Sequence, residues 1–155
     1  MPDAQRNASS VVVHKKTLCR ACRICELVCS ATHDGACSAH LSRIHIVADD
    51  FGFSFPATIC SQCKSAECYG ACPRADLALC IDPETGTRYI DESECDGCGA
   101  CAEACPLPRS PIWSKLVGDA TVFFKCDLCR GIEGGPQCVE MCPWESLVHK
   151  QKVKR

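Results

Sequence analysis

Short apolar runs separated by polar turns predict small strands along much of this chain. Val11 to Lys15, Arg43 to Val47 and Val122 to Lys125 each predict such a strand. Between Leu77 and Asp91, apolar residues stand on both sides of a Pro-Glu-Thr-Gly turn, which predicts a β-hairpin. Aromatic and small residues alternate over Phe51 to Pro56, which predicts an edge strand in the core or in an interface. We therefore expect an α+β fold with a thin hydrophobic core.

The cysteine content is the strongest compositional signal. The chain has 18 Cys in 155 residues, far above ordinary usage, which indicates either a disulfide scaffold or bound metal. Met1 to Ser10 is polar and lacks both a secretory signal and a twin-Arg pair, and no apolar stretch is long enough for a membrane span. We expect a cytoplasmic protein, or one that crosses a membrane only with a partner that carries the signal. In a reducing cytoplasm, clustered thiols favour metal over disulfides.

Sixteen of the cysteines fall into four groups. Group one is Cys19, Cys22, Cys25 and Cys29; group two is Cys60, Cys63, Cys68 and Cys72; group three is Cys95, Cys98, Cys101 and Cys105; group four is Cys126, Cys129, Cys138 and Cys142. Each group opens with C-x2-C and closes with C-x3-C, and a proline follows groups two, three and four. Cys37 and Cys80 remain, and we expect them to be small buried apolar side chains.

The spacing within a group has a physical reason. Two residues between cysteines let a tight loop curl, so that three successive thiolates bind three corners of one [4Fe-4S] cubane. The fourth cysteine lies about one helical turn further on and points past this cluster toward a second one. The proline after it helps to end the local structure, and we expect a short helix after each C-x3-C. The sequence therefore predicts four [4Fe-4S] clusters on sixteen cysteine ligands.

Zinc is the main alternative. Structural zinc sites pair two C-x2-C knuckles across a spacer of about a dozen residues or more. Groups one and three have no such spacer, whereas group four has eight residues between its second and third cysteines and is the most zinc-like. Zinc at all four groups, or at group four alone, stays open. His33 near group one is the best-placed alternative ligand.

Charge excludes some functions and indicates how the clusters are tuned. The net charge of −2, without a basic stripe, gives no sign of nucleic-acid binding. The chain has no phosphate loop, flavin or nicotinamide fingerprint or nucleophile motif, so we expect no catalysis here. Four cations adjoin ligands, and each is a charge that makes its cluster easier to reduce, a solvated surface charge or a contact to a partner: Arg20, Arg23, Lys64 and Lys125. Acidic residues that would disfavour reduction crowd group three: Asp91, Glu92, Glu94, Asp96 and Glu103.

The Pro-rich segment from Pro106 to Trp113 is either a docking surface or a cap over a cluster.

The chain resembles a known family from about Val11 to Val148. The resemblance lies in the order of the four groups, with a long spacing in group two and a stretched group four. It is similar to the four-cluster ferredoxin-like subunits of molybdenum and tungsten oxidoreductases and of related hydrogenase and formate-lyase complexes. The compact length and the segment from Cys19 to Ser30 look most like the small iron–sulfur subunit of tungsten-dependent aldehyde oxidoreductases.

The resemblance implies a single polyferredoxin domain over 1–155, with two nested ferredoxin-like units. The outer half, 11–47 plus 118–148, carries groups one and four, and the inner half, 56–110, carries groups two and three. The fourth cysteine of each group then ligates the cluster held by the other group of the same half. The implied ligand sets are set 1, Cys19, Cys22, Cys25 and Cys142; set 2, Cys29, Cys126, Cys129 and Cys138; set 3, Cys72, Cys95, Cys98 and Cys101; and set 4, Cys60, Cys63, Cys68 and Cys105.

The resemblance also implies partners and a role in anaerobic metabolism. The chain would be a wire, with the group-one cluster nearest a larger catalytic subunit that carries a tungsten or molybdenum pterin. A flavin subunit or a ferredoxin is the candidate for the second redox partner, and self-stacking of copies is a further hypothesis. Two alternatives stay open: a free polyferredoxin that serves several enzymes, and a zinc-binding structural module.

Overall fold

The computed structural model describes residues 8–49 and 51–152. The ends of the domain predicted over 1–155, and most of the polar segment Met1 to Ser10, lie outside the described residues. None of the helices in the described ranges is long and apolar enough to cross a membrane.

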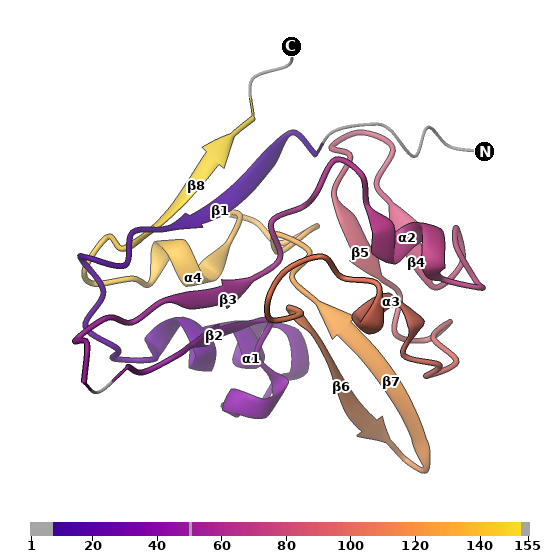
Figure 1. Ribbon diagram of the computed structural model, residues 1–155, viewed down its shortest axis with the longest axis horizontal. Helices are drawn as coiled ribbons and strands as arrows, with labels where there is room; N and C mark the ends of the chain where they lie inside the picture. The colour runs from indigo at the N-terminus through magenta and orange to yellow at the C-terminus, as the bar shows by residue number, and fades with distance from the viewer. Residues whose placement is uncertain (1–7, 50, 153–155) are drawn as a thin grey trace.

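Within the described residues, the strands form antiparallel pairs. The pairs are β1 (Ser10–His14) with β8 (Leu147–Gln151), β2 (Ile44–Ile46) with β3 (Ala57–Ile59), β4 (Leu79–Ile81) with β5 (Arg88–Ile90), and β6 (Ile112–Val117) with β7 (Ala120–Lys125). The β1–β8 pair joins the two ends of the described chain, as Figure 1 shows. The strands predicted at Val11, Arg43 and Val122 and the hairpin after Leu77 are therefore confirmed, whereas β3, β6 and β8 were not predicted.

The helices lie inside the cysteine groups. They are α1 (Ile24–Asp34), α2 (Glu67–Ala71), α3 (Ala100–Glu103) and α4 (Gln137–Glu140), with a 3-10 turn η1 at Ala39–Leu41. Each α-helix contains the third cysteine of its group, and all but α1 end before the fourth. The prediction that helices follow C-x3-C was therefore wrong, because the three-residue spacing is itself close to a helical turn.

Helix packing gives the chain its nested arrangement. Helix α1 packs against α4, and α2 packs against α3, so the first group meets the last and the two middle groups meet each other. Strand β1 precedes α1 and β8 follows α4 along the chain, so the β1–β8 pairing continues the same nested order. The fold is thus the mixed, ferredoxin-like α+β architecture that the sequence predicts.

The segment from Phe51 to Pro56 is not the predicted edge strand. It begins as a turn closed by a bridge between Asp49 and Ser54, and the Asp49 carboxylate accepts hydrogen bonds from the amides of Phe51 and Gly52 at 3.3 and 3.0 Å. A side chain that bonds its own backbone in this way favours a turn over a strand. Phe51 and Phe53 are 99% and 85% exposed, and only Phe55 packs against the core.

The core is small and rich in thiols. Its main cluster of eleven buried residues contains six cysteines, which lie among Val12, Ile44, Ile46, Leu128 and Leu147. Cys37 is exposed and Cys80 is only partly buried, so the prediction that both are buried was wrong. The Cys80 thiol donates to the carbonyl oxygen of Leu77 at 3.2 Å, and Cys80 pairs with Tyr89 in the β4–β5 hairpin.

An ion-pair network joins α1, β6 and the segment just before group three. The Arg43 guanidinium contacts the carboxylates of Asp34 and Glu92 at 2.8 and 2.6 Å, and Lys115 on β6 contacts both carboxylates as well. Burial opposes ionisation of Asp34, but the hydrogen bonds from Lys115 and Arg43 outweigh it and lower the pKa of that carboxyl group. Glu92, predicted as a charge near group three, is thus a structural partner.

Candidate metal centres

The C-x2-C loops of all four groups have the same backbone curl. In each, the residue just before the second cysteine is left-handed: φ is 54° at Ala21, 50° at Gln62, 73° at Gly97 and 62° at Leu128. Three of these residues are not glycine, and the conformation costs a residue with a side chain about 1–2 kcal/mol. Strain of this kind persists where a site requires it, so the loops share the geometry that the spacing predicts.

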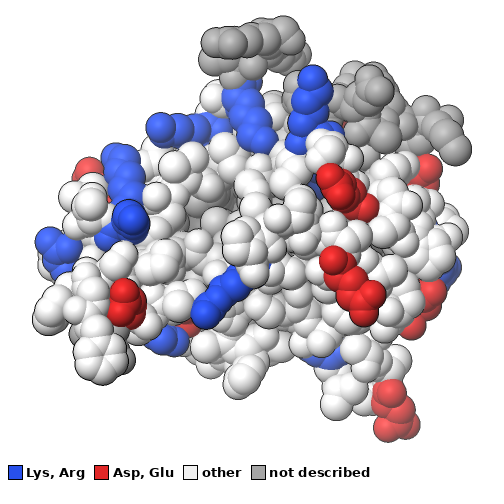
Figure 2. Space-filling model, viewed as in Figure 1, with Lys and Arg blue, Asp and Glu red and all other residues white. Residues whose placement is uncertain are grey.

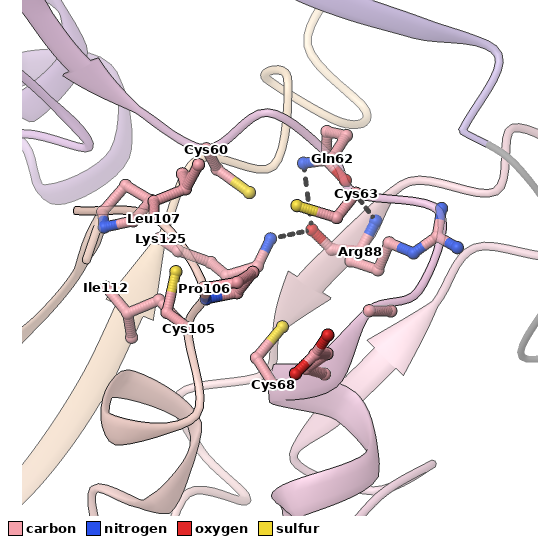
Figure 3. A pocket seen from close by; sticks show the side chains of 13 residues that line it. Cys60, Gln62, Cys63, Cys68, Arg88, Cys105, Pro106, Leu107, Ile112 and Lys125 are labelled. Carbon is pink, nitrogen blue, oxygen red and sulfur yellow. Dashed lines mark hydrogen bonds between the residues drawn. The ribbon is translucent and has the colours of Figure 1, made fainter. Parts of the chain in front are cut away.

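Set 4 lines a cavity between the two middle groups. Its thiols come from Cys60, Cys63 and Cys68 of group two and from Cys105 of group three, and Figure 3 shows their sulfur atoms around a common space. Pro106 and Leu107 line the same cavity, so the Pro-rich segment begins as a cap there. Leu107 and its neighbours Pro108 and Arg109 also line a larger surface groove beside β3.

Set 3 lines a second cavity, formed by Cys95, Cys98 and Cys101 of group three with Cys72 of group two. The backbone amide of Phe123 donates to the Cys95 sulfur at 3.4 Å. Cys101 is buried but Cys98 is exposed, so this cavity lies close to the surface.

Set 2 lines a third cavity, and it also crosses between groups. Cys126, Cys129 and Cys138 of group four share it with Cys29 of group one, while Cys142 is not among its lining residues. The backbone amide of Arg43 donates to the Cys29 sulfur at 3.3 Å. Group four alone is therefore not gathered into one four-thiol site, which is what a zinc site within that group would need.

Set 1 combines buried and exposed cysteines. Cys22 is exposed, whereas Cys19 and Cys25 belong to the main core, against which Cys142 packs. The Cys142 sulfur lies 3.2 Å from the Ser146 hydroxyl. Burial opposes ionisation of Cys142, but this contact and nearby backbone amides lower the pKa of its thiol.

Some thiols lie near a thiol of another set. Burial is the largest cause that raises the pKa of Cys138, and Cys25 of set 1 adds to it. Burial likewise raises the pKa of Cys126, with a contribution from Cys60 of set 4. It raises the pKa of Cys101 to about 12, with Cys68 of set 4 the first of the neighbouring thiols that add to it. Cys25 therefore lies near Cys138, Cys60 near Cys126 and Cys68 near Cys101.

The residues of these sets fit an iron–sulfur cluster. Burial raises the pKa of Cys25 to about 12 and that of Cys129 to about 11, so these crowded thiols stay protonated at neutral pH without a counter-charge. Metal ions supply that charge, and the backbone amides that point at Cys29 and Cys95 are donors to the coordinated sulfur. All-cysteine sets of four are typical of [4Fe-4S] clusters.

His33 lies beside set 2 rather than within set 1. Its ring nitrogens lie 2.9 Å from the Cys29 carbonyl oxygen and 3.0 Å from the Asp127 carboxylate. One ligand atom each of His33, Asp127 and Cys129 lie within 4.8 Å of one another, so His33 is close to a metal position without replacing a cysteine of the set.

Two polar residues around set 4 could not be recognised from the sequence. Gln62 is fully buried, accepts from the Arg88 amide at 2.7 Å, and donates to the carbonyl oxygens of Arg88 and Cys126 at 3.2 and 3.0 Å. Arg88 is 1% exposed and lines the cavity. The only sequence signal is a glutamine where the other loops have Ala, Gly or Leu, and its long-range contacts leave no local pattern.

An α+β fold with four-thiol cavities at crossed cysteine groups defines a ferredoxin-like iron–sulfur protein. The comparison with families agrees: the model of the 4Fe-4S dicluster domain matches residues 51–152. The chain belongs to this family and binds [4Fe-4S] clusters.

Similar proteins are electron carriers by name. The chain is 40% identical, over 80% of its length and 66% of the relative's, to the polyferredoxin-like subunit of aliphatic sulfonate oxidoreductase from Pyrococcus furiosus. It is 29% identical, over 88% of its length and 85% of the relative's, to the electron transport protein HydN of Escherichia coli K12. About a third of the Pyrococcus relative lies outside the match. The chain is accordingly an iron–sulfur electron-transfer protein of oxidoreductase systems, not a catalytic one.

A solved structure shares the fold. A chain of the BamBC active-site complex of benzoyl coenzyme A reductase, with bound 1,5 dienoyl-CoA, matches 97% of this chain at a TM-score of 0.54 and 23% identity. The match covers 80% of that chain.

Proposed function

We propose that the chain carries four [4Fe-4S] clusters, one on each of sets 1 to 4, and relays electrons along the order 1, 2, 4, 3. The observation that supports it most is the crossing: three cavities are each lined by three thiols of one group and one of its partner group. Each bound cluster would accept and release one electron at a time. The division into outer and inner halves belongs to this proposal. The β2–β3 pair joins one half to the other, and β6 lies in the segment between the inner half and the second part of the outer half.

The two ends of the series are where electrons would enter and leave. Set 1 and set 3 each have an exposed cysteine, Cys22 and Cys98, whereas Cys126, Cys129 and Cys138 of set 2 are buried. Interior thiols that are shielded from water keep transfer within the chain, and exposed ends allow a partner to approach.

We assign the set 1 end to a larger catalytic subunit, as the resemblance implies. Apolar side chains next to these ligands are exposed: Leu18 by 41%, Leu27 by 43% and Trp144 by 48%. Exposed apolar side chains close to the ligands support an interface with a partner protein at this end. The proposed partner is a tungsten or molybdenum pterin enzyme such as an aldehyde oxidoreductase, and the Pyrococcus relative adds an aliphatic sulfonate oxidoreductase to the candidates. A flavin subunit or a ferredoxin would meet set 3.

The test is metal analysis of the chain purified without oxygen, alone and with the proteins that co-purify. We expect about 16 iron and 16 sulfide per chain and a larger subunit that stays bound. Zinc without sulfide would instead identify a structural module. A fully loaded monomer that reduces several enzymes without binding any of them would identify a free polyferredoxin.

A further inference from the structure

The ammonium group of Lys125 is buried at the set 4 cavity. Lys125 ends β7, is 2% exposed and lines the cavity together with the four thiols. Its Nζ donates to the carbonyl oxygens of Arg88 and Cys126, the latter at 3.2 Å, and Figure 3 shows it pointing into the space between the sulfur atoms. Among the described residues, none of the ion pairs involves Lys125. A buried cation that meets only carbonyl dipoles leaves most of its charge uncompensated.

Two more cations lie around the same thiols. Arg88 lines the cavity, and burial lowers the pKa of its guanidinium while the thiols of Cys68, Cys60 and Cys63 act in the opposite direction. Lys152 on the far side donates to the carbonyl oxygens of Ser61 and Gln62 at 3.1 and 2.7 Å, within the loop that holds Cys60 and Cys63. Among the described residues, Glu67 is the one carboxylate that lines the cavity, and it is exposed. Set 4 therefore combines four thiols with the buried ammonium of Lys125, which is in none of the ion pairs of the described residues.

The cations at the other sets are either neutralised or exposed. At set 2, Arg43 is paired with Asp34 and Glu92, and His33 is paired with Asp127. The described lining of the set 3 cavity contains Asp96 and neither Lys nor Arg. At set 1, Arg20 and Arg23 are both exposed, and Arg23 lies 3.5 Å from the carboxylate of Glu26. An uncompensated buried cation is thus particular to set 4 among the described sites.

We propose that Lys125 makes set 4 the position that accepts the first electron, by raising the reduction potential there above that at the other three sets. The inference rests on the proposed function, because it requires a cluster on these four cysteines. Reduction adds one negative charge without making or breaking a bond, and the electron comes from the partner or, in a titration, from dithionite. A fixed positive charge that water does not screen stabilises the reduced form more than an exposed one does.

The placement has a consequence for the relay. The Cys126 carbonyl that accepts from Lys125 belongs to a set 2 residue, so the ammonium lies where sets 2 and 4 meet. An electron from either end is then held in the interior, away from the exposed Cys22 and Cys98.

The test compares Lys125→Met with Lys64→Met in the full chain, by EPR-monitored redox titration and iron analysis. Methionine keeps an unbranched apolar stem and removes the charge. Lys64 is the matched control, because it also adjoins a set 4 ligand, Cys63, but is exposed. We expect Lys125→Met to keep its iron and to lower the highest midpoint by at least about 59 mV, which is tenfold in a one-electron equilibrium. We expect Lys64→Met to leave that midpoint unchanged.

A second variant, Cys105→Ser, assigns the signals even if Lys125→Met fails to assemble. It replaces a set 4 thiolate, so the signal of the first-reduced cluster is expected to disappear or shift. An unchanged first-reduced signal in Cys105→Ser, or an unchanged highest midpoint in an iron-loaded Lys125→Met, would overturn the inference and leave the four-cluster relay intact. Wild-type protein without iron and sulfide would instead overturn the proposed function.

Discussion

Sets 4 and 3 each offer four cysteine thiols, but in opposite electrostatic surroundings. Both are assembled from groups two and three by the same crossing, and Cys68 of set 4 is close enough to Cys101 of set 3 to raise the pKa of its thiol, after burial. Set 4 has Lys125 and Arg88 buried at its wall, whereas set 3 has Asp96 in its lining and an exposed thiol at Cys98. Cysteine spacing therefore determines where a cluster is held, and the charges around it determine how easily it is reduced.

The surface has a similar asymmetry at larger scale. On the face shown in Figure 2, Asp and Glu lie mostly toward α2 and α3, and Lys and Arg mostly toward β1 and β8. Exposed charges of this kind are screened within about 10 Å at moderate salt. They bear on partner encounter more than on the potentials, which leaves the buried Lys125 as the main electrostatic difference between the two sets.

The largest expected effect is the loss of the set 3 cluster while the set 4 cluster is kept, and Gly97→Ala is the variant that should cause it. In Gly97→Ala, the new Cβ would collide with the carbonyl oxygen of Thr121, and the left-handed backbone would add about 1–2 kcal/mol of strain. Because Gly97 stands between Cys95 and Cys98, we expect the loss of about 4 of 16 iron per chain, measured by metal analysis, with the set 4 signal retained.

Gly118→Ala is the matched control for that variant. Gly118 in the β6–β7 turn is also left-handed, at φ +62°, but a Cβ there would meet nothing within 4 Å. The control bears the backbone cost without the collision and is expected to keep all of its iron. Full iron loading in Gly97→Ala would show that set 3 does not depend on this loop.

A smaller effect is expected from the charge beside set 3. Asp96→Asn keeps the oxygen that accepts from the Cys98 amide at 3.2 Å and removes the negative charge. The midpoint of the set 3 cluster should rise, by less than the roughly 59 mV of a tenfold change, because Asp96 is exposed. EPR-monitored titration measures the shift, and Glu84→Gln in the exposed β4–β5 turn should cause none. A shift as large as that of Lys125→Met would remove the distinction between buried and exposed charge.

The sequence predicted those features that depend on local pattern. The cysteine spacing predicted the curled loops, and apolar runs predicted β1, β2, β7 and the β4–β5 hairpin, because each of these is encoded within a few residues. The resemblance implied the crossed sets, and the structure gathers the thiols of sets 2, 3 and 4 into shared cavities.

The features that were missed depend on distant partners. Strand β8 is half polar and exposed and forms only by pairing with β1, from the other end of the described chain. Strand β6 directly follows a Pro-rich run that concealed it. The role of Gln62 depends on carbonyl groups 26 and 64 positions away, so no motif could indicate it. The sequence identified Lys125 as a neighbour of a ligand. Its burial, on which the proposed effect on the reduction potential depends, could be seen only in the fold.

The most direct test of the account is the number of electrons that one wild-type chain accepts. The matched family is named for two clusters, whereas the four thiol sets predict four one-electron reductions per chain. Coulometric titration of the anaerobically purified protein, with EPR spin quantitation on the same sample, measures this number. Four electrons per chain, with spin–spin broadening between neighbouring clusters, is the predicted result. Two electrons per chain in a fully iron-loaded sample would contradict the four-cluster relay.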